Sequence, residues 1–140
     1  VAFAADGPFT AEIKARQGLM QVAGFNIGVL AAMVKGKRDY DAKIAAKAAK
    51  SVHMAAMIDD SPLLWPEGSD LTNKDLTIET AAKIDAWTTF PEVTEKHKAW
   101  LDASAELAEV AGNGLDALKP AVGAVGKSCK GCHDDFRQKK

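Results

Sequence analysis

The sequence is poor in cysteine, proline and tyrosine, and its charges nearly cancel. With two cysteines in 140 residues, the chain must bury a core without disulfide staples, and it is long enough to do so. A net charge of −1 creates no general attraction to nucleic acid or to an anionic membrane. No apolar run approaches the roughly 20 residues that span a bilayer. We therefore expect a soluble protein with neither nucleic-acid binding nor membrane insertion.

Helical periodicity is the main pattern that is present. Apolar residues recur at spacings of three and four over roughly 9–35, 40–58, 91–111 and 115–138, with a short helical stretch at 75–87. No stretch shows the alternation of a strand, and the connection between the second and third long helices is the longest. The pattern predicts an all-α, antiparallel four-helix bundle that forms one domain over residues 1–140.

The first residues, VAFAAD, are similar to the end of a secretory signal. Ala2-Phe3-Ala4 has the small-x-small pattern that precedes signal-peptide cleavage. Residues 1–5 would then be a signal-peptide remnant on an exported protein. The alternative is an apolar terminus that only frays.

The two cysteines stand three apart near the C-terminus, in SCKGCHDDF. C-x-x-C-H is the attachment signature of c-type haem. Cys129 and Cys132 lie on one side of a helix and can each add to a vinyl group, and His133 can then bind the iron. The motif predicts one haem c held by two thioethers, with His133 as an axial ligand. It also favours export, because this attachment takes place outside the bacterial cytoplasm.

Three other interpretations of the motif are weaker. A thioredoxin-like pair normally begins a helix after a strand, whereas this pair lies deep in a helix. A zinc site needs about four ligands, and neither His53 nor His97 has a suitable spacing to complete one. The third is a chance match. We expect both of these histidines to lie at the surface without a role.

Several apolar residues elsewhere are suited to surround a porphyrin. The first helix offers small residues beside Met20, and the loop and third helical region offer aromatic side chains that would suit a haem edge. Each aromatic residue has an ordinary core position as its alternative. The residues concerned are Ala23, Gly24, Gly28, Leu64, Trp65, Trp87 and Trp100.

The chain resembles the cytochrome c prime family, in GKSCKGCHDDFRQKK (126–140), ARQGLMQ (15–21), MVKGKRDYDA (33–42) and LWPEGS (64–69). The resemblance implies a four-helix bundle with haem near the C-terminus, a periplasmic location and a homodimer packed through the first two helices. It also implies that Arg137 lies on the proximal side of the haem and that Arg16 pairs with a haem propionate. The alternative for Arg16 is a surface charge.

Met20 separates two functions within that family. In one branch a methionine at this place ligates the iron, and the protein carries single electrons. In the other the iron is five-coordinate and binds nitric oxide or carbon monoxide. We expect Met20 to ligate, because Gly24 lets the helix approach the ring, and we expect Met33, Met54 and Met57 to be core residues. No ionisable residue stands near Met20 to act as an acid or base, so we expect no enzyme.

Basic residues cluster around the attachment motif. Such a cluster could dock an acidic redox partner, where charge steers the encounter. The alternative is that these cations complement the dipole at the end of the helix. The residues are Lys127, Lys130, Arg137, Lys139 and Lys140.

Overall fold

The computed structural model of the protein describes residues 6–58 and 62–139, so the signal-peptide remnant predicted at 1–5 lies outside the described residues. Within the described part the regular structure is helical, apart from a single isolated bridge between Ala82 and Arg137. The helices are α1 (Thr10–Val34), α2 (Ala42–Ala56), α3 (Asp85–Thr88), α4 (Phe90–Val110) and α5 (Leu115–Phe136).

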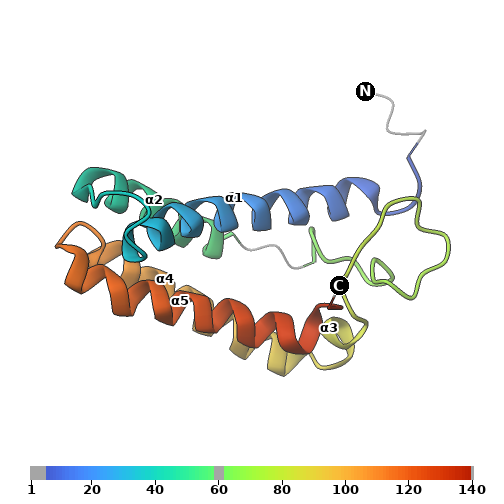
Figure 1. The fold of residues 1–140 in the computed structure, drawn as a ribbon. Coiled ribbons are helices and arrows are strands. Elements are labelled where there is room, and N and C mark those ends of the chain that lie inside the picture. Colours follow the sequence, from blue (N-terminus) through green and yellow to red (C-terminus); the bar gives the residue numbers. More distant parts are fainter. Residues whose placement is uncertain (1–5, 59–61, 140) are drawn as a thin grey trace.

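The four long helices form an antiparallel bundle (Figure 1). α2 packs against α1 and α4, and α5 packs against α4 and α1, so the four helices close around a common interior. The predicted all-α four-helix bundle is therefore confirmed. The long connection between α2 and α4 gathers at one end of the bundle, beside the first turn of α1 and the last turn of α5 (Figure 1).

The prediction of a helix over residues 75–87 is wrong for most of that range. The helix here begins only at Asp85, and the preceding segment is irregular. Asn73 accepts a hydrogen bond from the backbone of Asp75 at 2.9 Å, and such local side-chain bonds compete with helix formation. Ala82 is held in an extended bridge with Arg137. Tertiary pairing has overridden a weak helical pattern.

Local residues fix where the long helices begin and end. The carboxylate of Asp41 accepts a hydrogen bond from Ile44 N at 2.9 Å and caps α2. Gly114, with φ of 106°, occupies a conformation that favours glycine just before α5. The hydroxyl of Tyr40 donates to Ala111 O at 2.9 Å and accepts from Gly114 N at 2.8 Å. This single hydroxyl ties the start of α2 to the turn between α4 and α5.

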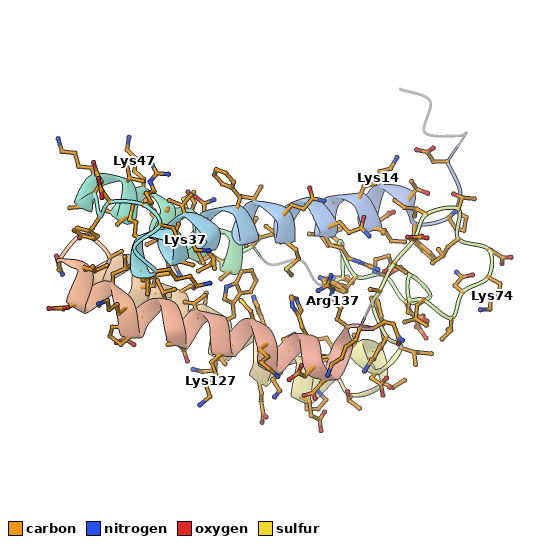
Figure 2. All side chains as sticks on the ribbon, in the orientation of Figure 1. Lys14, Lys37, Lys47, Lys74, Lys127 and Arg137 are labelled. Atoms are coloured by element: carbon orange, nitrogen blue, oxygen red, sulfur yellow. The ribbon has the colours of Figure 1, made fainter. Side chains whose placement is uncertain are left out.

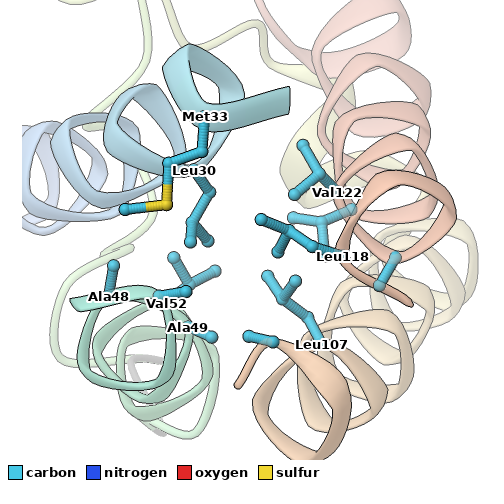
Figure 3. Close-up of a cluster of buried hydrophobic side chains, with 12 residues drawn as sticks. Leu30, Met33, Ala48, Ala49, Val52, Leu107, Leu118 and Val122 are labelled. Carbon is cyan, nitrogen blue, oxygen red and sulfur yellow. The ribbon is translucent and has the colours of Figure 1, made fainter. Parts of the chain in front are cut away.

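The buried core occupies the end of the bundle opposite to the long connection. Charged side chains such as Lys14, Lys47 and Lys127 extend away from it (Figure 2). All four long helices contribute apolar side chains that meet in one cluster (Figure 3). The cluster consists of Leu30, Met33, Ala45, Ala48, Ala49, Val52, Leu107, Ala111, Leu118, Ala121, Val122 and Val125.

The helix α1 is unusually apolar for its exposure. By length and composition alone it could cross a membrane, a test that core helices and signal sequences also pass. Only 17% of its most apolar window is buried within the chain. Val22 and Phe25 are 53% and 71% exposed, so much of α1 presents an apolar face that this chain does not cover.

Candidate haem site

The C-x-x-C-H motif lies near the end of α5. Cys129, Cys132 and His133 are each half-buried, and Cys129 packs against the core cluster. Burial raises the pKa of both thiols, and the neighbouring Cys129 raises the pKa of Cys132 further. Burial, together with the positive charge of Arg137, lowers the pKa of His133. Its imidazole is therefore neutral at neutral pH, which is the form that ligates a metal.

The fold brings Met20 to the same level of the bundle as this motif. α1 and α5 are antiparallel and in contact, and Met33 of α1 shares the core cluster with Leu118 of α5. Met20 lies 13 residues before Met33, and Cys132 lies 14 residues after Leu118. At about 1.5 Å per residue, Met20 lies about 20 Å from Met33 along α1, and Cys132 lies about 20 Å from Leu118 along α5, toward the same end of the bundle.

The side chains at this level fit a large apolar cofactor. On α5, the buried positions stop at Val125 and resume at Phe136, and the attachment motif falls in the interval. The Nε1 of Trp100, on α4, is buried without a hydrogen-bond partner in the described structure. Buried donors are rarely left unpaired in a complete structure. A motif whose thiols and imidazole are only half-buried, together with a buried donor on α4 that has no partner among the described residues, fits side chains that would surround a porphyrin.

The zinc alternative finds no support in the geometry. Among the described residues, no three His, Cys, Asp or Glu side chains gather so as to hold a metal ion. The motif therefore lacks the further ligands that a tetrahedral site requires.

Arg16 is buried, with 3% of its surface exposed, so the surface alternative for this residue is wrong. Its Nη1 donates to Leu64 O at 3.2 Å and to Ser69 Oγ at 2.6 Å. Its Nη2 donates to Ser69 O at 2.6 Å and to Thr80 Oγ1 at 3.0 Å. Burial lowers the pKa of Arg16 to about 10, opposed by the charge of Asp70, so the guanidinium stays protonated at neutral pH. Its pairing with a haem propionate stays a prediction.

The tryptophans are divided between two roles. Trp65 and Trp87 pack on Arg16, whose Cζ lies 4.5 Å and 5.8 Å from the two ring centroids, and Trp87 Nε1 donates to Trp65 O at 2.9 Å. Trp100 packs against the core cluster. Gly24 and Gly28 are exposed within this chain, and the expectation that they face the porphyrin stays a prediction.

The methionines and histidines outside the motif also correct the sequence analysis. Met33 is a core residue as predicted, at 1% exposed, but Met54 and Met57 are 57% and 60% exposed. The two histidines are half-buried links between α2 and α4. His53 Nδ1 lies 3.0 Å from Ser104 Oγ, and His97 Nε2 donates to Ala56 O at 2.9 Å. The expectation that both histidines lie at the surface without a role is therefore wrong, because the neighbouring lysines indicated an exposed helix face.

The basic cluster is partly neutralised. Lys130 pairs with Asp134, and Lys139 lies 3.9 Å from the same carboxylate. Lys127 points away from the bundle (Figure 2), and Arg137 is exposed at the end of α5. Lys140 lies outside the described residues.

Sequence reasoning missed the segment that receives Arg16. Ser69 is fully buried and Thr80 is half-buried, and both accept its hydrogen bonds. The only available signal was that Ser69 ends the LWPEGS stretch. Periodicity and spacing say nothing about an irregular loop that folds over a distant helix.

Comparisons with known proteins agree with this geometry. The family model for cytochrome c′ matches residues 11–137. The chain is 39% identical over 128 residues to a cytochrome c′ from Cereibacter sphaeroides, covering 91% of this chain and 83% of that protein. A solved cytochrome c′ from Rhodobacter sphaeroides superimposes with a TM-score of 0.88 at 36% identity, covering 94% of this chain and 98% of the other.

A solved structure with a bound gas is also similar. It is a ferrous variant of cytochrome c prime from Alcaligenes xylosoxidans with bound NO, at 27% identity and a TM-score of 0.73. The match covers 92% of this chain and 94% of that one.

Proposed function

This chain belongs to the cytochrome c′ family, whose members hold covalently attached haem c, and we propose that it is a periplasmic carrier of single electrons. The observation that carries the proposal is the antiparallel contact between α1 and α5, which by residue count would bring Met20 and His133 to the same level of the bundle. A thioether from one side and an imidazole from the other would complete the coordination of one iron. Export follows from the thioether attachment that Cys129 and Cys132 would make.

Each residue of the site has a definite task in this proposal. Cys129 and Cys132 would anchor the cofactor, and neutral His133 would bind iron through its free nitrogen. Bound haem c supplies an iron that exchanges single electrons. Met20 lies on the long helix α1, one turn after the buried Arg16, so its sulfur would move little during transfer. We assign no catalytic acid or base, because Met20 and Ala23 present no ionisable group.

A second candidate is binding of nitric oxide or carbon monoxide at an open sixth position. The structure of the Alcaligenes relative with bound NO favours it, because that protein shares this fold. Methionine is also a common gap filler, and Met20 would then pack over the iron without binding it.

The oxidised and reduced visible spectra of the purified protein separate these functions. Ligation predicts a weak far-red band in the ferric protein, which Met20→Leu abolishes. Met57→Leu is the matched control, since Met57 is 60% exposed, and it should retain the band. A high-spin spectrum in the wild-type protein that changes on adding carbon monoxide would instead establish the gas-binding function.

We further propose an acidic redox partner that docks on the basic cluster. Lys127 extends into solvent beside the motif, whereas Lys130 and Lys139 are shared with Asp134. A field of this kind steers encounter and is screened by salt. Electron exchange should slow as ionic strength rises, and Lys127→Glu should weaken that dependence. If the rate of electron exchange does not depend on salt, the cluster does not dock a partner, and its cations only complement the dipole at the end of α5.

The apolar face of α1 supports a homodimer packed through α1 and α2. Gly18, Val22 and Phe25 follow one stripe of α1, separate from the stripe that contains the buried Ala23 and Leu30. Phe25 is 71% exposed, and a large aromatic residue in such a stripe is typical of an interface.

A further inference from the structure

The guanidinium of Arg16 fastens α1 to the long connection one turn before Met20. Four hydrogen bonds run from its two terminal nitrogens to Leu64, Ser69 and Thr80, between 2.6 and 3.2 Å. The fork of a guanidinium can reach several acceptors at once in a fixed geometry, which a lysine ammonium cannot. Gln17 adds a fifth bond, from its Nε2 to Glu79 O at 2.9 Å.

The same connection is fastened to the end of α5. Thr80 Oγ1, which accepts from Arg16, also accepts from Ala82 N at 3.2 Å. The adjacent backbone is paired with the residues that follow His133: Gln138 N donates to Ala81 O at 2.7 Å, and Lys83 N donates to Phe136 O at 2.9 Å. One threonine hydroxyl therefore joins the α1 attachment to the α5 attachment.

This link lies outside the main core cluster, at the end of the bundle where Ile13 and Phe136 are the buried apolar side chains nearest to it in sequence. At the other end of the bundle, buried side chains such as Leu30 and Leu118 hold α1 and α5 together. At the site, Met20 and His133 are only half-buried. Arg16 lies one turn before Met20, and Phe136 lies nearly one turn after His133. The hydrogen-bonded path thus connects the helical segments that carry the two proposed iron ligands.

We infer that Arg16, Ser69 and Thr80 form a strut that sets the separation between the Met20 segment and the His133 segment. The strut controls how firmly the sixth position of the iron is closed, an inference that rests on the proposed haem function. Arg16 is a positioning residue in this role, in addition to any contact with a propionate. Loosening the strut lets α1 move away from α5 without removing any ligand.

The test uses Thr80→Val in the complete haem-loaded protein. Valine keeps the shape of threonine and removes the one oxygen that accepts from both Arg16 and Ala82. Thr77→Val is the matched control, because Thr77 is in the same connection but its hydroxyl accepts from Gly7 N. Ser69→Ala is a second variant, which removes a different acceptor of the same guanidinium.

Two measurements are made on each variant. The first is the rate of carbon monoxide binding to the reduced protein. We expect this rate to rise about tenfold in Thr80→Val, because the loss of one hydrogen bond to a charged donor corresponds to about that factor. The second is hydrogen exchange of the amides of Lys83 and Gln138, which we expect to become faster. Thr77→Val should match the wild type in both.

The outcomes separate this inference from the proposed function. Met20→Leu against wild type shows whether Met20 occupies the sixth position, and that result does not depend on the strut. If Thr80→Val and Ser69→Ala bind carbon monoxide at the same rate as Thr77→Val, the strut is overturned. This conclusion holds whether or not Met20 ligates the iron. Faster exchange combined with a faster rate in both strut variants supports it.

Discussion

Replacing Tyr40 with phenylalanine removes one oxygen from the end of the bundle that is far from the haem site. That hydroxyl donates to Ala111 O at 2.9 Å and accepts from Gly114 N at 2.8 Å. Phenylalanine keeps the ring and its packing against the core cluster, so the perturbation is confined to these two bonds. Ala111 is fully buried, and water would not readily replace the lost donor.

The expected loss follows from the two bonds. A hydrogen bond contributes a net 0.5–1.5 kcal/mol, so the free energy of unfolding should fall by about 2 kcal/mol. With a denaturant slope of about 2 kcal/mol per M of urea, the unfolding midpoint should fall by about 1 M. The slope itself should not change, because the folded state buries the same surface.

Urea unfolding followed by far-ultraviolet circular dichroism measures this loss, and the visible spectrum of the same sample provides the control. We expect the spectrum of Tyr40→Phe to match the wild type, because the hydroxyl lies at the opposite end of the bundle from Met20 and His133. An unchanged midpoint would refute the assignment of the hydroxyl as a tie between helices. A changed spectrum would refute the separation of the core end from the site end.

Three further predictions concern the core, the connection and the surface. Leu107→Ala should lower the free energy of unfolding by about 2–5 kcal/mol, because Leu107 is fully buried in the cluster, and urea unfolding measures it. Burial raises the pKa of Asp70, but hydrogen bonds from Thr72 and the charge of Arg16 outweigh it and hold the pKa below its usual value. The stability that this carboxylate contributes is present above about pH 4 and is lost as the pH falls through the lower, folded-state pKa. Asp70→Asn should therefore lose less stability than the wild type on acidification below about pH 4. Equal losses in the two proteins would contradict the assignment. Phe25→Lys should convert the proposed dimer to a monomer in sedimentation velocity, whereas Phe90→Lys, at an exposed position on α4, should not. Sedimentation of Phe25→Lys that is unchanged from the wild type would exclude the α1 face as the interface.

The sequence by itself determined the helices and the attachment site, because both depend only on residues that are close together in the chain. Periodicity over a few turns located the four long helices, and glycines such as Gly114 marked the joints. Cys129, Cys132 and His133 are contiguous on one helix, so their relative placement follows from the helix alone. These predictions needed no contact between distant residues.

Only the tertiary structure decided what surrounds that site. Arg16 and Ser69 are 53 residues apart, and no local pattern records that a loop folds over the first helix and buries its cation. The links of His53 and His97, and the extended pairing of Ala82 with Arg137, are likewise between elements far apart in the chain. The physical reason is common to all of them. Hydrogen bonds between distant segments depend on how helices pack, and packing is a property of the whole fold.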